Sequence, residues 1–302
     1  MSADSPRGMG WMPEYPSIRD YTVTTDTVSD KLKTLRQAPI AAMLGKVKAL
    51  TPPPKLPSTI DLRAWCPPIE DQGSIGSCTA NAGVGLVEYF ERRAFGRHID
   101  ASRLFLYKTT RSLLHWTGDT GAFLRTTMEA LTLFGVPPEE YWRYVIADYD
   151  KEPSAFCYSF ALSYKAITYY RLDPVGTSPK DLLTRIKANL SKGLPVMFGF
   201  TVFQSYDQAA SNGGKFPFPT SAERIVGGHA VDAVGYDERL KIKNTNPGGV
   251  ETTGALLIRN SWGTGWGDRG YGWLPYDYVL KGLAEDWWSV LKTEWIDTGN
   301  FG

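Results

Sequence analysis

Cys78 stands where a loop rich in glycine and serine changes into an apolar pattern with helical spacing, in the stretch DQGSIGSCTANAGVGLVEYF at residues 71–90. A thiol in the first turn of a helix lies near the partial positive charge of the free N–H groups, which favours the reactive thiolate. Gly73 and Gly76 allow the backbone to approach a ligand closely. Cys78 is therefore a candidate nucleophile, although a lone cysteine is more often a small core side chain.

A cysteine nucleophile needs a base, and the chain has three histidines. His98 and His115 lie beside the ends of expected helices, where a surface or packing role is the simpler interpretation. His229 follows Gly227 and Gly228 and precedes the apolar stretch AVDAVGY, which places its ring at the start of an expected strand. We therefore expect His229 to be the base.

The base must be held in one tautomer by a third group, because a freely turning imidazole loses its hydrogen bond to the thiol. Asn260 ends the apolar stretch GALLIRN and is followed by Ser261, Trp262 and Gly263. Its side-chain carbonyl is suited to orient His229. The alternative for an asparagine at the end of a strand is simple turn chemistry.

Helical patterns fill the first half of the chain and strand patterns dominate the second. Helices are expected at residues 78–94, 102–114, 122–134 and 179–191. Strands are expected at residues 194–203, 229–236, 254–262 and 270–279, separated by glycine-, asparagine- and proline-rich turns. This order predicts an α+β protein with two lobes, and ligand sites tend to lie at such a seam. The sequence contains no internal repeat.

Three motifs in this order resemble the papain-like cysteine peptidases: QGSIGSC at 72–78, GGHAV at 227–231 and RNSWGTGWGDRGYG at 259–272. The resemblance runs from about Leu56 to the C-terminus. It implies a two-lobed papain-like fold with a helical left lobe at about 56–160, an antiparallel β right lobe at about 161–302, and the active-site cleft between them. The pattern is that of a bacterial-type member without the usual disulfides.

The resemblance also assigns roles to residues of this chain. It makes Cys78 the nucleophile, His229 the general acid and base, Asn260 the residue that orients His229, and Gln72 a donor to the oxyanion hole. Its substrate-binding residues would be Gly118, Gly121, Gly228 and Trp262, with Trp262 shielding the bond between His229 and Asn260 from water. The implied activity is hydrolysis of peptide bonds in peptides or proteins through a thioester on Cys78, without a cofactor or metal.

Two other functions remain open at this stage. The same residues can pass an acyl group to an amine, which would make the protein an acyltransferase. The chain can also be a latent or binding-only protein whose groove is filled by its own N-terminus. The presence of a nucleophile, a base, an orienting residue and an oxyanion donor weighs against a protein without activity.

The sequence departs from the family pattern at several places. Ile75 stands where many relatives have a disulfide-forming cysteine, and Thr79 stands where the signature has an aromatic residue. His229 follows Cys78 by 151 residues, somewhat more than is usual in the family. The excess fits an inserted hairpin near residues 238–254, which leaves the site intact if it lies on the surface.

Residues 1–55 occupy the position of the family's propeptide and end in the spacer Thr51-Pro52-Pro53-Pro54. The segment is shorter than the usual pro-region, lacks its long charged helices, and has one short helical candidate at about residues 30–50. We expect it to lie in or beside the cleft and to lower activity. A merely structural extension packed on the right lobe is the alternative.

Composition limits the partners and the compartment. The 302 residues carry 33 basic and 32 acidic side chains, and no uncharged apolar stretch is long enough for a membrane span, so neither nucleic acid nor a membrane is an expected partner. The three cysteines are too few for a disulfide scaffold, and no signal peptide is visible, so a reducing, cytoplasmic location is expected. Cys66 and Cys157 are more simply buried free thiols than a disulfide pair.

Overall fold

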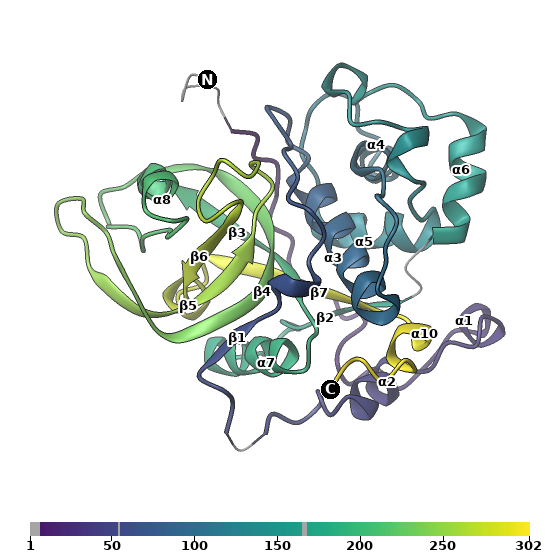
Figure 1. Ribbon diagram of the computed structural model, residues 1–302, viewed down its shortest axis with the longest axis horizontal. Coiled ribbons are helices and arrows are strands. Elements are labelled where there is room, and N and C mark those ends of the chain that lie inside the picture. The colour runs from purple at the N-terminus through teal and green to yellow at the C-terminus, as the bar shows by residue number, and fades with distance from the viewer. Residues whose placement is uncertain (1–6, 54, 165–167) are drawn as a thin grey trace.

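A computed structural model of the chain, drawn in Figure 1, describes residues 7–53, 55–164 and 168–302. The first six residues of the N-terminal segment and Pro54 of the proline-rich spacer lie outside the described residues. Helices gather in one half of the molecule and strands in the other (Figure 1). The expected α+β architecture with two lobes is confirmed.

The helical half is built from α3 (Cys78–Phe95), α4 (Arg103–Leu113), α5 (Leu124–Leu133) and α6 (Ala155–Ala161). The first three match the expected helices to within two residues at each end. Helix α3 ends at Gly96, whose φ of +73° is the left-handed conformation that glycine adopts without strain. Helix α4 is preceded by its N-cap Ser102, whose side chain accepts a hydrogen bond from the amide of Phe105.

The described part of the other half contains a seven-stranded antiparallel sheet in the order β2-β7-β3-β4-β5-β6, with β1 paired to β4. The strands are β1 (Thr59–Asp61), β2 (Thr168–Arg171), β3 (Val196–Phe203), β4 (Ile225–Lys243), β5 (Glu251–Arg259), β6 (Tyr271–Pro275) and β7 (Ala284–Leu291). The sequence pattern indicated β3 to β6 but not β1, β2 or β7. Strands β4 and β5 continue as a hairpin through the pairs from 241–253 to 243–251, where the insertion was expected.

Short helices complete the sheet half and the connections. Helix α7 (Pro179–Ser191) has the expected bounds, with Ser178 as its cap. The expected strand at 270–279 is wrong in its second half, because Pro275 ends β6 and the chain turns into helix α9 (Tyr276–Leu280). Two further short helices are α8 (Asp207–Ser211) and α10 (Thr293–Ile296). The 3₁₀ turns lie at Arg63–Trp65, Glu139–Tyr141, Ile146–Asp148, Leu162–Tyr164 and Gln204–Tyr206.

Helix α3 joins the two halves. It packs against β3, β4 and β7, and buried side chains from both halves form one continuous apolar cluster. Figure 1 shows α3 beside the sheet, with α4 and α5 as its neighbours in the helical half. The start of α3 is therefore brought next to the strands that follow it late in the sequence.

The N-terminal segment carries two short helices, α1 (Asp30–Thr34) and α2 (Ile40–Lys46), in place of the one expected stretch. Helix α2 packs against α10 near the C-terminus. The purple trace before α1 runs between the sheet and the helical half in Figure 1. Trp11 on this trace belongs to the common core, so the segment is part of the packed structure.

Three chemical features of the described residues bear on the sequence expectations. Cys66, Cys78 and Cys157 are free and buried, so Cys66 and Cys157 are not bonded to each other. The described helices include none that is long and apolar enough to cross a membrane. The same residues contain no group of histidine, cysteine and carboxylate side chains that could hold a metal ion.

Candidate active site

Cys78 is the first residue of α3 and is fully buried. The loop before it turns at Gly73, whose φ is +63°. At Gly76 the amide donates a 2.8 Å hydrogen bond to the carboxylate of Asp119, which fixes the last turn of the loop. The loop therefore holds the thiol at the helix N-terminus, as the sequence predicted.

His229 lies on β4, opposite Phe200 of β3, and is fully buried. Its Nε2 is 2.8 Å from Oδ1 of Asn260. Because a carboxamide oxygen only accepts, Nε2 carries the proton and Nδ1 of the neutral ring is left as an acceptor. Nδ1 has no hydrogen-bond partner among the described residues. The ring of Trp262 stacks on the imidazole, with centroids 4.5 Å apart and an angle of 22° between the planes.

Asn260 follows β5 directly and is buried. Its backbone amide donates to the carbonyl of Gly270, and its Oδ1 also accepts a 2.8 Å hydrogen bond from the amide of Ser261. These contacts fix the carboxamide so that its oxygen faces His229. The structure thus brings His229, Asn260 and Trp262 together, although they come from β4 and from the loop after β5.

Gln72 connects the loop before Cys78 to the loop after Asn260. Its Oε1 accepts a hydrogen bond of 2.5 Å from the hydroxyl of Ser261, and its backbone amide donates to the carbonyl of the same residue. Its Nε2 donates to the carbonyl oxygens of Ile75, at 2.9 Å, and Gly8, at 3.0 Å. Gln72 is fully buried, so its amide nitrogen points at the backbone of the N-terminal segment and not at water.

The N-terminal segment crosses this site by pairing backbone with backbone. The amide of Gly8 donates to the carbonyl of Gly73, and the amide of Trp11 donates to that of Gly228, both at 3.1 Å. The carbonyl of Gly10 accepts a 2.8 Å hydrogen bond from the amide of Ala122. Residues 8–12 therefore lie as an extended strand between the helical half and β4.

Trp11 fills the space beside His229. Only 5% of its surface is exposed, and its indole N–H donates to the carboxylate of Asp286 over 3.3 Å. A Cβ atom on Gly199 would lie 1.8 Å from the indole, and one on Gly228 would lie 2.4 Å from the Trp11 carbonyl oxygen. The absence of side chains at Gly199 and Gly228 therefore makes the room that the tryptophan occupies.

Burial changes the acidity of the two reactive groups in opposite directions. It raises the pKa of the Cys78 thiol to about 11, and the nearby backbone amides of Ala230, Gly10, Thr79 and Trp11 act in the opposite direction. It lowers the pKa of His229 to about 4, against the hydrogen bond to Asn260. The sequence favoured a thiolate at Cys78 because of the helix terminus, but in this covered site both groups are neutral at pH 7.

The four residues named for substrate binding lie in different places. Gly228 and Trp262 contact the N-terminal segment, and a Cβ on Gly121 would lie 2.1 Å from the Gly10 carbonyl oxygen. Gly118 lies apart from these contacts, where its amide donates to the carboxylate of Asp150. Ala122, the residue after Gly121, pairs its backbone with Gly10 and Met12 of the N-terminal segment.

Sequence reasoning missed two residues of the site, Trp11 and Asp286. The sequence signal for Trp11 was the pattern Gly-Met-Gly-Trp at residues 8–11, since small residues beside a tryptophan permit close packing of the backbone. Asp286 lies in β7, which the pattern did not reveal, and no local feature distinguishes it from other acidic residues.

A protein-family model described as papain family cysteine protease matches residues 56–285. The chain belongs to this family. It is therefore a hydrolase with a cysteine nucleophile, and the resemblance seen in the sequence is confirmed together with the papain-like fold. The family match begins after the N-terminal segment.

Individual relatives extend this picture. The chain is 33% identical over 289 residues to an uncharacterized peptidase C1-like protein of Acanthamoeba polyphaga mimivirus, covering 94% of this chain and 86% of the relative. The solved structure of xylellain, a cysteine protease from Xylella fastidiosa, superposes with a TM-score of 0.71 at 30% identity and covers 97% of this chain and 99% of that one. Coverage this high includes most of the segment before residue 56.

Cathepsin K of Gallus gallus is a more distant relative, 26% identical over 221 residues. That similarity covers 72% of this chain, and the chain spans 58% of the length of cathepsin K.

Proposed function

We propose that this cysteine endopeptidase is made in a latent form, and that Cys78, His229, Asn260 and Gln72 carry its reaction. Nδ1 of His229 takes the thiol proton, and the thiolate attacks the carbonyl carbon of a peptide bond. The resulting oxyanion accepts hydrogen bonds from Nε2 of Gln72 and the backbone amide of Cys78. His229 then protonates the leaving amine as the C–N bond breaks.

Hydrolysis of the thioester completes the cycle. Water gives one proton to Nδ1 of His229 and attacks the acyl carbon, and the departing sulfur takes that proton back as the acid product leaves. Asn260 keeps Nε2 engaged throughout, so the ring presents the same nitrogen in both steps. The 2.8 Å contact between His229 and Asn260, with Nδ1 left over as an acceptor, is the observation that supports these roles.

Latency is supported by what covers the site. The Gly8 carbonyl accepts a hydrogen bond from Nε2 of Gln72, the donor that an oxyanion would need. The amide of Trp11 donates a hydrogen bond to the carbonyl of Gly228. Cys78 and His229 are fully buried beneath these contacts. A peptide substrate and residues 8–11 would therefore compete for the same backbone groups.

The segment would block the site by lying over Cys78. The backbone amides of Gly10 and Trp11 lie near the sulfur of Cys78. Activation would need the segment to move or to be removed.

The test compares the full chain with a chain that begins at Pro13, which keeps α1 and α2 but loses the strand in the cleft. Hydrolysis of a fluorogenic peptide library should be at least about tenfold faster for the shorter chain, and thiol-directed inhibitors should label Cys78 faster. The matched control carries Cys78→Ala in both chains and should be inactive. Equal rates for the two folded chains would refute latency while leaving the catalytic roles to be tested separately.

A further inference from the structure

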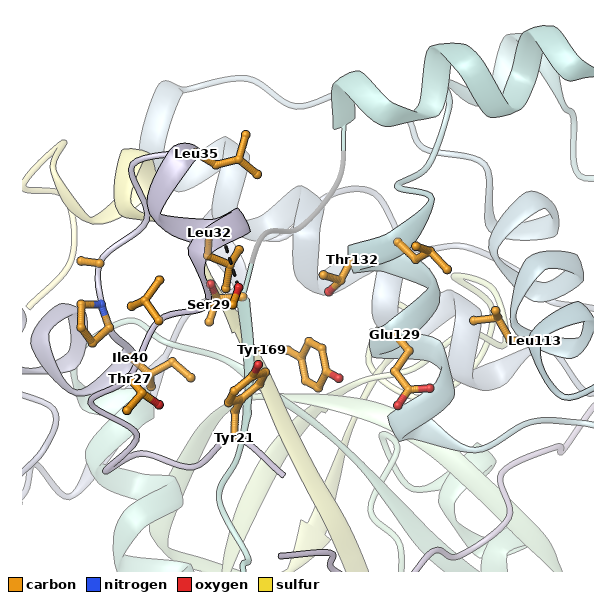
Figure 2. A pocket seen from close by; sticks show the side chains of 15 residues that line it. Tyr21, Thr27, Ser29, Leu32, Leu35, Ile40, Leu113, Glu129, Thr132 and Tyr169 are labelled. Atoms are coloured by element: carbon orange, nitrogen blue, oxygen red, sulfur yellow. Dashed lines mark hydrogen bonds between the residues drawn. The ribbon is translucent and has the colours of Figure 1, made fainter. Parts of the chain in front are cut away.

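A cavity lies away from the active site, between the N-terminal segment and the helical half. Its volume is about 420 Å³, within the range of pockets that hold small molecules. Figure 2 shows Leu32 and Ile40 on one side, Glu129 and Leu113 on the other, and Tyr169 between them. The mechanism proposed above makes no use of this cavity.

The two sides of the cavity come from different parts of the chain. One wall belongs to the N-terminal segment and includes the apolar or aromatic side chains of Tyr21, Val28, Leu32, Leu35, Pro39 and Ile40 and the hydroxyl groups of Thr27 and Ser29. The other belongs to the peptidase domain and consists of Leu113, Glu129, Thr132, Leu133, Thr168 and Tyr169. The cavity therefore exists only while the segment lies on the domain.

The lining is mainly aliphatic and aromatic, with an acidic group at one side. The ring of Tyr21 meets that of Tyr169 edge to face, with centroids 6.0 Å apart. The carboxyl group of Glu129 faces the cavity from α5 (Figure 2). Such a surface fits a ligand with an apolar body and one polar group.

The charges around Glu129 indicate the sign of that polar group. Burial raises the pKa of Glu129, Glu14 and Asp20 raise it further, and Arg125 acts in the opposite direction. Arg125 is already paired with the carboxylates of Glu14 and Asp20. Of these four groups three are acidic, so a ligand cation beside Glu129 would be attracted and an anion repelled.

We propose that this cavity binds a small hydrophobic amine, whose ammonium group lies beside Glu129, and that the bound amine holds the N-terminal segment on the peptidase domain. A ligand that contacts both walls binds the closed arrangement and loses half its contacts when the segment leaves. By linkage it shifts the equilibrium toward the closed arrangement. The effect on activity rests on the proposed latency, but binding and the hold on the segment do not.

Binding is tested with the full chain by calorimetry and NMR, using 3-phenylpropylamine, the alcohol 3-phenylpropanol and the acid 3-phenylpropanoate. The amine should bind, the alcohol more weakly and the acid least. Glu129→Gln should reduce the amine's affinity about tenfold and remove the preference for amine over alcohol. Leu133→Trp should fill the cavity and abolish binding, whereas Val175→Trp places the same side chain on an exposed surface elsewhere and should leave it unchanged.

The hold on the segment is tested by hydrogen exchange in the Cys78→Ala chain, which needs no catalysis. The amine should slow exchange in residues 21–40 of the full chain, and Leu133→Trp should remove its effect.

If latency also holds, the amine should slow hydrolysis by a Trp11→Ala chain, whose segment is loosened. Absence of amine binding at millimolar concentration would overturn the site, and binding without slower exchange would overturn the hold on the segment. Slower exchange with unchanged hydrolysis would contradict only the proposed latency.

Discussion

The carbonyl oxygen of Gly8 accepts a 3.0 Å hydrogen bond from Nε2 of Gln72, and the same nitrogen donates 2.9 Å to the carbonyl of Ile75. Both N–H groups of the side-chain amide are therefore used while the segment is in place. If Gln72 has the proposed role, a substrate oxyanion would form its bond to Nε2 only after Gly8 has left. The first three predictions below follow from this competition and from the burial of the site.

Gly10→Val should release the segment. A Cβ at this position would lie 2.0 Å from the carbonyl oxygen of Gly76, and backbone cannot give way as a flexible side chain can. A clash costing about 1–3 kcal/mol would raise kcat/KM of the full chain by about 5- to 150-fold. Steady-state kinetics measures the change, with Pro13→Ala as the neighbouring control. An unchanged kcat/KM would show that the segment does not limit access.

Gln72→Ala should have two opposing effects. In a chain that begins at Pro13, loss of the proposed oxyanion donor should lower kcat about 10²- to 10³-fold with a smaller change in KM. In the full chain the same change also removes the donor to Gly8, so labelling of Cys78 by a thiol reagent should become faster. A fall in kcat without faster labelling would argue against competition at this nitrogen.

Stability should depend on pH through His229. Its pKa in the folded chain is lowered to about 4 from an ordinary 6.5, so the folded state disfavours the charged ring. This contribution is fully present above pH 6.5 and is lost as the pH falls toward 4, by roughly 3 kcal/mol. Urea unfolding at pH 7 and pH 4.5 measures it as the difference between the wild type and His229→Gln.

The comparison with His229→Gln is needed because other buried groups titrate too. Burial raises the pKa of Asp286 to about 7, so its contribution is present at low pH and is lost as the pH rises through 7. The Asp286 effect is common to both proteins and cancels in the difference. Identical pH profiles for the two proteins would contradict the assigned role of His229 burial.

The space that Trp11 occupies should accept a large substrate side chain once the segment is gone. A Cβ on Gly199 would lie 1.8 Å from the indole, so Gly199→Val should shrink this space. In the chain that begins at Pro13, the variant should lose activity on peptides with an aromatic residue at the selective position and keep it on those with alanine there. A peptide-library profile measures this change. An equal loss of activity on both classes of peptide would show that the space does not select the substrate side chain.

Local signals account for the parts of the site that the sequence could predict. The glycine loop before Cys78 and the cap at Gly96 define α3, and Ser178 with Pro179 defines the start of α7. His229 begins one recognisable apolar stretch, and Asn260 ends another. Each of these features depends on residues within a few positions of one another, where turn and cap chemistry acts.

The rest depends on contacts between distant residues. Trp11 and Asp286 are 275 positions apart, and neither has a local pattern that requires the other. The acidity of Cys78 was wrongly inferred because the helix terminus can be read from sequence and the covering strand cannot. Strand β7 was missed since its charged start and paired tryptophans do not alternate as a half-buried strand would.

The strand that crosses the site belongs to the same chain as the site itself. A separate inhibitor leaves when the solution is diluted, but a tethered strand keeps the same local concentration at any protein concentration. Dilution would therefore not activate the enzyme. A higher protein concentration would not increase its inhibition either. A cut in the tether would turn this unimolecular equilibrium into a bimolecular one, and only then could the strand diffuse away.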